Sequence, residues 1–267
     1  MECKKWNGKK NRNNYLEFCK NAIEDENIFN QIKNRVEYNM VEKPGIEYKK
    51  IGDWLLNIYI KEYKHLLKYL ETGINNDKYL KPVKFDYEYL LKDKVELSTY
   101  KLSYCCISYT IKAINILKHI QSLKLDKVNI IEIGGGYGGQ SFILHNLCIN
   151  FNIKIESYTI IDLEYPSKIQ NKYIELLNIP NTQSFYNIEN IDTSKFNFFI
   201  SNYALSEIST KIQNKYIDNL LKNIKHGFLL WNFLNKEEMN PYFKKKGKHI
   251  REKCNPQTSK NSIEIKY

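Results

Sequence analysis

The sequence predicts an α/β fold with a mostly parallel sheet of seven strands that closes in an antiparallel hairpin. Three observations support it. Short apolar runs alternate with helical patterns from Val128 onward, and a glycine-rich run directly follows the first of them. Two strand candidates near the end of the chain, residues 249–254 and 262–267, are joined by a loop through Pro256. We therefore expect residues 1–123 to form a helical region and residues 124–267 to form the α/β domain.

The first region is expected to be helical and to lack strands. Apolar residues recur at helical spacing over residues 16–36, 51–70 and 102–120, and Pro44-Gly45 separates the first two of these stretches. Ser98 is the expected N-cap of the third helix. This region would act as a lid over the site formed by the second region.

The second region is expected to contain five parallel strands before the closing hairpin. The strands are predicted at Val128–Ile133, Lys154–Asp162, Thr182–Tyr186, Phe196–Ser201 and Phe228–Phe233. The carboxyl ends of parallel strands meet at one edge of the sheet, and ligands of such sheets bind beyond that edge. Polar residues that follow these strands are therefore the candidates for function.

Composition limits the classes of function. Of 267 residues, 42% are hydrophobic and 13% aromatic, which is typical of a globular protein and excludes a disordered chain. No apolar run is long enough to cross a bilayer, and the lysine-rich N-terminus has no signal sequence, so we expect a cytoplasmic protein without a membrane partner. The six cysteines show no C-x-x-C spacing, which gives no indication of a metal site.

The net charge of +11 raises the question of a nucleic-acid partner. The positive charge comes almost entirely from lysine, because Arg12, Arg35 and Arg251 are the only arginines. Proteins that recognise nucleic acids favour arginine for its bidentate geometry. We therefore expect no nucleic-acid partner, while an acidic or phosphorylated small molecule is compatible with the charge.

The glycine-rich run Ile130-Ile-Glu-Ile-Gly-Gly-Gly-Tyr-Gly-Gly139 carries the main indication of function. Glycines allow a sharp turn from strand to helix and a close approach of a ligand to the backbone. The spacing fits the dinucleotide pattern G-x-G-x-x-G through Gly134, Gly136 and Gly139. It equally fits the methyltransferase pattern E/D-x-G-x-G-x-G, which begins at Glu132.

Three features favour S-adenosyl-L-methionine over NAD as the cofactor. Glu132 near the end of its strand could meet the cationic amino group of S-adenosylmethionine, whereas a pyrophosphate is anionic and is served by the helix N-terminus. The α/β region is too short for two mononucleotide-binding halves, and its sheet closes in an antiparallel hairpin. The sequence thus predicts the Rossmann-like fold of class I methyltransferases.

The expected cofactor contacts follow the first four strands. Asp162 ends the second strand, where an acidic residue binds both ribose hydroxyls. Asn187 or Asp192 after the third strand could contact the adenine. The full set of expected contacts is Glu132, Gly134, Gly135, Gly136, Tyr137, Gly138, Asp162, Leu163, Asn187, Ser201 and Asn202.

The methyl acceptor is expected beside the run Ser201–Glu207, after the fourth strand. Methyl transfer to a hydroxyl needs positioning and a base that takes the proton. We expect Glu207 to be that base and Tyr203 to position the acceptor together with Asn202. The alternative is that Glu207 only caps the next helix or pairs with a lysine. Asn232 and Glu237 are the second-choice residues near the acceptor.

The positions of the histidines and of the acidic residues indicate neither a catalytic histidine nor a metal site. His119 and His226 precede the first and fifth strands and so should lie at the opposite edge of the sheet. His145 lies in the helix after the glycine loop and is expected to pack there, and His65 belongs to the helical region. No adjacent acidic pair follows the strands, so we expect no metal ion.

Several runs of residues resemble the family of sugar O-methyltransferases, over about residues 95–267. The runs are EIGGGYGGQ (132–140), YTIIDLEYPSKIQNKYIELL (158–177), FFISNYALSEI (198–208), GFLLWNF (227–233) and NPQTSKNSIEI (255–265). The resemblance implies methylation of a sugar hydroxyl in surface-carbohydrate synthesis, with S-adenosylmethionine as cofactor. It implies that Gly134, Gly136, Gly138 and Asp162 contact the cofactor, and that Asn202, Tyr203 and Glu207 face the acceptor.

The expected substrate is therefore a free sugar, a sugar nucleotide or a glycan. Tyr100, Tyr104 and Tyr109, ahead of the first strand, are expected to cover the cofactor. Two alternatives stay open. One is an RNA methyltransferase, which the charge of +11 and the run Lys244–Lys246 suggest. The other is a non-catalytic, cofactor-binding scaffold, against which the glycine run and Asp162 speak.

Overall fold

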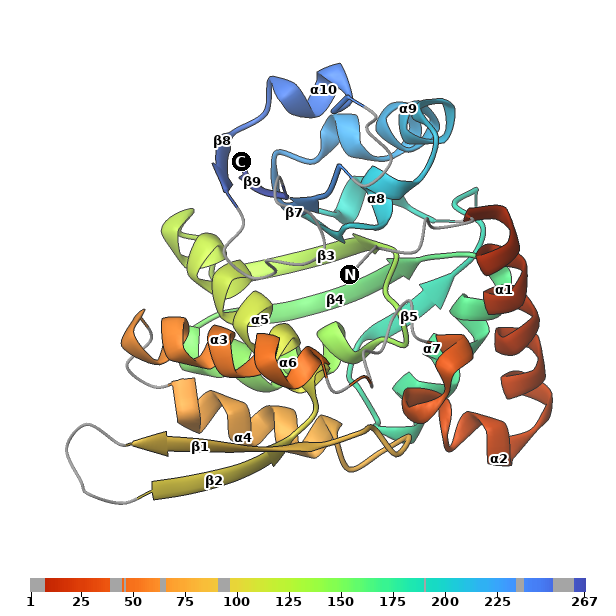
Figure 1. Cartoon of the computed structure of the whole chain (residues 1–267). Coiled ribbons are helices and arrows are strands. Elements are labelled where there is room, and N and C mark those ends of the chain that lie inside the picture. The colour runs from red at the N-terminus through yellow and green to blue at the C-terminus, as the bar shows by residue number, and fades with distance from the viewer. Residues whose placement is uncertain are drawn as a thin grey trace. The chain divides into compact units, whose positions relative to one another are not determined.

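A computed structural model of the chain describes residues 8–38, 45, 47–62, 66–90, 97–189, 191–233, 238–251 and 262–267 (Figure 1). The chain divides into two compact units, Met1–Ser108 and Tyr109–Tyr267. The division falls within helix α5 (Tyr104–Ser122), earlier than the expected boundary after residue 123. Most of α5 belongs to the second unit because it packs on the sheet, for example through the rings of His119 and Phe198, 5.8 Å apart.

The first unit contains strands as well as helices. Its elements are α1 (Gly8–Glu24), α2 (Glu26–Phe29), η1 (Ile32–Asn34), η2 (Val36–Tyr38), α3 (Glu47–Glu62), α4 (Leu66–Asn76), β1 (Phe85–Leu90) and β2 (Leu97–Leu102). β1 and β2 pair antiparallel, so the expectation of a strandless region is wrong. The run FDYEYL of β1 alternates apolar and polar residues with a period of two, and Phe85 and Tyr87 are buried while Asp86 is exposed.

Helix α5 begins at a buried polar cluster. Ser103 Oγ accepts a hydrogen bond from Cys106 N–H at 3.0 Å, which is the geometry of an N-cap. Asp77 in turn accepts bonds from the backbone N–H and the hydroxyl of Ser103, at 2.6 and 2.8 Å. The expected N-cap, Ser98, lies instead within β2, because the strand continues to Leu102.

The second unit is built on a seven-stranded sheet. Its strands are β3 (Lys127–Ile133), β4 (Lys154–Ile161), β5 (Thr182–Phe185), β6 (Phe198–Asn202), β7 (His226–Trp231), β8 (Lys248–Arg251) and β9 (Ile263–Lys266). Their order is β5-β4-β3-β6-β7-β9-β8, and only β9 runs antiparallel to its neighbours β7 and β8. The expected fold class is thereby confirmed. The order reverses between β3 and β6, which is the switch point where open α/β sheets bind ligands.

Helices cover both faces of this sheet. They are α6 (Gly139–Leu147), η3 (Cys148–Phe151), α7 (Glu164–Leu176), η4 (Thr193–Lys195), α8 (Ala204–Glu207), α9 (Thr210–Asn219), η5 (Leu221–Asn223) and α10 (Pro241–Lys244). α5 and α6 lie on one face and α9 and α10 on the other (Figure 1). None of the helices in the described ranges is long and apolar enough to span a membrane.

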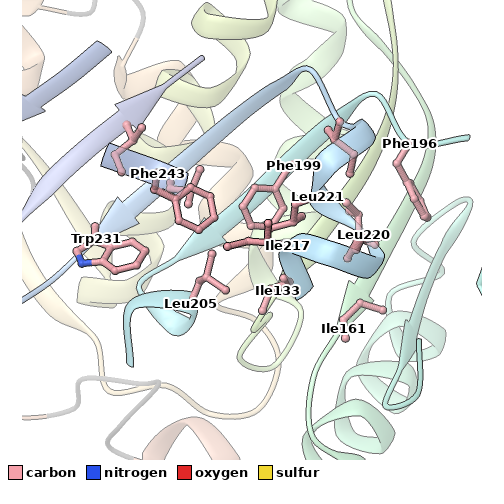
Figure 2. Close-up of a cluster of buried hydrophobic side chains, with 14 of the residues drawn as sticks. Ile133, Ile161, Phe196, Phe199, Leu205, Ile217, Leu220, Leu221, Trp231 and Phe243 are labelled. Atoms are coloured by element: carbon pink, nitrogen blue, oxygen red, sulfur yellow. The ribbon is translucent and has the colours of Figure 1, made fainter. Parts of the chain in front are cut away.

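The face below α9 carries an apolar cluster (Figure 2). Ile131 and Ile133 of β3, Phe199 of β6 and Trp231 of β7 point into it, and Phe243 of α10 packs on Trp231 with ring centroids 5.6 Å apart. Side chains alternate between the faces of a strand. Glu132, which lies between Ile131 and Ile133, therefore points to the α5 face, as do Phe198 and Asn202 of β6.

Candidate functional site

The glycine loop between β3 and α6 needs glycine at most of its positions. Gly134, Gly136 and Gly138 have φ angles of +78°, +59° and +92°, which other residues rarely adopt. A Cβ atom on Gly134 would lie 2.1 Å from Ala204 Cβ at the start of α8. The backbone thus adopts the left-handed conformation at three positions, and the loop contacts the segment that follows β6.

Tyr137 anchors this loop from within the protein. Its ring is fully buried and stands edge-on between Tyr109 of α5 at 5.8 Å and Tyr173 of α7 at 5.1 Å. A Cβ on Gly139 would come within 2.5 Å of the same ring. The side chain of Tyr137 is thus enclosed by protein, and only its backbone is left for the cofactor contact expected of it.

Asp162 supports the loop from the end of β4. Its carboxylate accepts hydrogen bonds from Gly135 N–H at 3.1 Å, Leu163 N–H at 2.8 Å and Gln170 Nε2 at 2.7 Å. A carboxylate has about four acceptor positions, so one is left, and binding both ribose hydroxyls requires one of these bonds to be exchanged. Burial raises the pKa of Asp162, and these hydrogen bonds offset part of the increase.

Gln170 is a part of the site that sequence reasoning missed. It lies in α7, is buried, and donates from the same nitrogen to Gly136 O at 2.8 Å. It therefore links Asp162 to the backbone of the glycine loop. The only signal for it in the sequence is its place on the inner side of the helix that follows Asp162.

Glu132 is buried, with 1% of its surface exposed. The pKa of Glu132 is raised to about 8, chiefly by burial and to a smaller extent by the nearby charge of Asp162. A 2.9 Å hydrogen bond from Tyr158 Oη and the ammonium of Lys112 offset part of this increase. Glu132 is therefore mostly protonated at neutral pH, and the expected pairing with a cationic amino group requires it to lose its proton.

Lys112 of α5 is the second residue that sequence reasoning missed. It is 7% exposed, and its Nζ lies 5.0 Å from the ring centroid of Tyr203 and 5.7 Å from that of Tyr109. These are distances of cation–π contacts. The helical pattern that placed residue 112 in α5 contains no signal for a buried ammonium.

The end of β6 contains two of the expected residues, Ser201 and Asn202. Ser201 is fully buried, donates its hydroxyl to Ile133 O at 3.0 Å and accepts from Leu205 N–H at 3.1 Å, so this side chain joins β3 to α8 and has no free surface for a cofactor. Asn202 Oδ1 is buried and has no hydrogen-bond partner in the described part of the chain. Buried amide oxygens are normally paired, so this oxygen indicates a ligand.

Tyr203 has a strained backbone. Its φ of +73° is unusual for a residue with a large side chain. The conformation is held because Tyr203 N–H donates to Leu230 O at 2.9 Å and Tyr203 O accepts from Ser206 N–H at 2.8 Å. Backbone strain of this kind is common at functional sites.

Glu207 and Asn232 meet at the same edge. Glu207 is exposed at the end of α8, and its Oε1 accepts a hydrogen bond from Asn232 Nδ2 at 2.8 Å. Asn232 is buried, and its N–H donates to Ser206 Oγ at 3.2 Å. Helix α9 has Ser209 at its N-cap, so Glu207 does not cap that helix. The carboxylate is thus held in place by a buried amide.

The two adenine candidates, Asn187 and Asp192, lie on the surface. Leu163, another expected cofactor contact, is 40% exposed after β4. Asn187 accepts a bond from Glu189 N–H at 3.0 Å, and Asp192 accepts from Ser194 N–H at 3.0 Å. Both polar side chains are exposed and stabilise local turns, and nothing in their surroundings distinguishes one as the adenine contact.

Three of the histidines, His119, His145 and His226, lie where the sequence places them. His226 is the first residue of β7, and His119 Nε2 lies 3.2 Å from Tyr267 O beside that end of the sheet. His145 packs at 6.0 Å from Tyr158 within the unit. His65, Glu237 and the side chain of Tyr100 are outside the described residues. Among the described residues no three His, Cys, Asp or Glu side chains gather as a metal site requires.

Comparison with known proteins gives partial likenesses. No family model matches the chain. Uncharacterized protein 1070 of Sulfolobus islandicus rod-shaped virus 1 is 26% identical over 148 residues, which is 54% of this chain but only 12% of the viral protein.

Three solved structures share part of the fold. They are a SAM dependent methyltransferase from Aquifex aeolicus (15% identity, 58% of this chain and 87% of that chain, TM-score 0.39), M. capricolum TrmK with S-adenosyl-homocysteine (12%, 57% and 66%, 0.38) and PKMT2 from Rickettsia typhi with AdoHcy (20%, 46% and 25%, 0.34). At these TM-scores the likeness is partial, so the strand order described above defines the fold.

Proposed function

We propose that this chain is a methyltransferase that uses S-adenosyl-L-methionine. The observation that carries the proposal is the glycine loop at the switch point of the sheet, flanked by Asp162 at the end of β4 and Asn202 at the end of β6. The strand order β5-β4-β3-β6-β7-β9-β8 is that of class I methyltransferases. When bound, this cofactor supplies an activated methyl group.

The residues present fit this cofactor. Three left-handed glycines at positions 134, 136 and 138 let a ligand approach the backbone closely. Asp162 offers a carboxylate for ribose hydroxyls, and Asn202 Oδ1 is a buried acceptor without a partner among the described residues. A catalytically silent scaffold would have no need of an exposed carboxylate held by Asn232 at the same edge.

Calorimetry with S-adenosylmethionine, S-adenosylhomocysteine and NAD tests the cofactor. We expect micromolar binding of the first two and none of NAD. Asp162→Ala should weaken binding by about tenfold to a thousandfold, because charge-assisted hydrogen bonds to the ribose are lost at about 1.5–3 kcal/mol each. Asp218→Ala, at an exposed position of α9, is the matched control. Wild-type affinity in the Asp162 variant would remove Asp162 from the site.

For the acceptor, we propose a sugar hydroxyl, free, nucleotide-linked or within a glycan. The resemblance of residues 95–267 to sugar O-methyltransferases supports it. An alcohol needs a base at the carboxyl edge of the sheet, and Glu207 provides an exposed carboxylate oriented by Asn232 at 2.8 Å. Tyr203, between Asn202 and α8, is then the positioning group beside it.

Transfer of isotopically labelled methyl groups identifies the acceptor. The protein is incubated with labelled S-adenosylmethionine and either a panel of sugars and sugar nucleotides or RNA, at several salt concentrations. Label in sugar only would support the proposal. Label in RNA, with affinity that falls steeply with salt, would establish the RNA alternative suggested by the net charge of +11. Cofactor binding without label in either class would favour the scaffold.

Glu207→Gln tests the proposed base. The amide keeps the hydrogen-bonding shape but accepts no proton, so turnover should fall by about 10²–10⁴ while cofactor affinity is unchanged. Glu175→Gln, exposed in α7, is the control. Near-normal turnover in the Glu207 variant at saturating acceptor and across pH would reduce Glu207 to a structural residue and transfer the role to Tyr203 or to Glu237.

A further inference from the structure

Lys112 has a buried charge without a counter-charge in contact. In the described part of the chain its ammonium has no hydrogen bond and no ion pair, only the rings of Tyr203 and Tyr109 at 5.0 and 5.7 Å. It favours the ionised form of Glu132 and so lowers the pKa of that residue, but Glu132 is mostly protonated at neutral pH. Burying an unpaired ammonium is costly, and cation–π contacts offset only part of that cost. The structure therefore lacks one anionic partner at this point.

Asn202 lacks a donor in the same region. Glu132 pairs with Ile200 in the parallel register of β3 and β6, and Asn202 follows Ile200 by two residues on the same face. Tyr203, whose ring contacts the Lys112 ammonium, is the next residue. The Lys112 ammonium and the unpaired oxygen of Asn202 are thus both associated with the carboxyl end of β6, the ammonium through the ring of Tyr203 and the oxygen on the α5 face of the sheet.

We infer that Lys112 and Asn202 bind the amino-acid end of the cofactor, Lys112 its carboxylate and Asn202 Oδ1 its ammonium. The inference rests on the proposed function. An α-amino-acid group presents an anion and a cation on one carbon, which matches an ammonium and an unpaired amide oxygen at the same end of β6 that do not bind each other. Glu132, protonated and hydrogen-bonded to Tyr158, does not neutralise Lys112 in advance.

This assignment has a consequence for selectivity. Lys112 is held between two tyrosine rings, so a ligand that lacks the carboxylate leaves its charge buried and unpaired. The site should discriminate strongly against cofactor analogues with a truncated amino-acid chain. Lys112 and Asn202 are then determinants of cofactor specificity.

The test uses three ligands and calorimetry on the full chain. S-adenosylhomocysteine has the whole amino-acid group, its decarboxylated analogue lacks the carboxylate, and methylthioadenosine lacks the amino-acid group. Lys112→Met should weaken binding of S-adenosylhomocysteine by about tenfold to a hundredfold and leave the other two ligands within about twofold. Asn202→Ala should weaken the first two ligands and spare methylthioadenosine.

Controls separate the possible outcomes. Lys118→Met, exposed in the same helix, should change none of the three affinities. Retained methylthioadenosine binding reports a folded site, and Lys112→Gln serves as a second variant. Equal losses for all three ligands, or no loss, would overturn the inference while leaving the proposed function intact. Wild-type protein that binds none of the three would overturn the proposed function and the inference with it.

Discussion

The two faces of the same sheet differ in what they bury. The face below α9 buries the apolar cluster of Figure 2, to which β3, β6 and β7 contribute Ile131, Phe199 and Trp231. The α5 face buries apolar residues as well, such as Ile130 and Phe198, but near the carboxyl ends of the strands it also buries Lys112, Glu132 and the amide oxygen of Asn202. One face is therefore apolar throughout the cluster, while the other combines apolar packing with polar groups, of which the Asn202 amide oxygen has no partner among the described residues.

Free energies explain this division. Apolar burial contributes about 25 cal/mol per Å² without a requirement for particular partners. A buried polar group without a partner costs about 1–3 kcal/mol. Apolar burial on the opposite face offsets the cost of such groups on the α5 face. Variants in the apolar cluster should therefore lower the free energy of unfolding, whereas variants of the unpaired polar groups on the α5 face should lower the affinity for ligands.

Phe199→Ala should have the largest effect on stability. Removing a fully buried ring from the cluster should lower the free energy of unfolding by about 3–5 kcal/mol. Urea unfolding measures it, with Ile212→Ala as control, because Ile212 is 41% exposed. If the folded variant also lost affinity for S-adenosylhomocysteine, the separation between the two faces would not hold.

Glu132→Gln should stabilise the protein at high pH. The folded pKa of about 8 lies above the ordinary value of 4.5, so between these values the folded state binds more protons, and wild-type stability falls as pH rises. The glutamine variant does not titrate there. Its free energy of unfolding relative to the wild type should grow from pH 4.5 to pH 8, by on the order of 3–5 kcal/mol. Unfolding curves that stay parallel across this range would contradict a neutral, buried Glu132.

Gly134→Ala should destabilise the glycine loop by about 2–3 kcal/mol. Part of this is the cost of φ = +78°, and part is the overlap with Ala204 Cβ. Adding Ala204→Gly should remove the overlap and leave about 1–2 kcal/mol. Thermal unfolding of the two single variants and the double variant measures both parts. No recovery in the double variant would mean that β3 and α8 do not approach this closely.

Ser201→Ala should have the smallest effect. Its hydroxyl joins Ile133 O to Leu205 N–H, and its loss should lower stability by about 1 kcal/mol. Affinity for S-adenosylhomocysteine should stay within about twofold of the wild type. Ser194→Ala, in an exposed turn, is the control. A clear loss of affinity would restore Ser201 to the cofactor contacts.

Elements that depend on a local pattern of residues could be predicted before the structure was known. Apolar runs separated by helical periods placed the strands that became β3 to β7 to within a few residues. The glycines of the loop could be recognised because only glycine tolerates the turns at positions 134, 136 and 138. The period of two in β1 is also present in the sequence, but over six residues it is too short to distinguish a strand from a loop.

Contacts between side chains from distant parts of the chain could not be predicted in this way. Lys112 and Tyr203 are far apart in the sequence, as are Gln170 and Gly136, and their contacts arise when α5 and α7 pack against the sheet. Packing also places the Ser201 hydroxyl in a hydrogen bond to the backbone of β3 and encloses the ring of Tyr137. The sequence pattern predicts both residues as cofactor contacts. A local pattern fixes the direction in which a side chain points, whereas its partner and its burial depend on elements that the chain brings together from elsewhere.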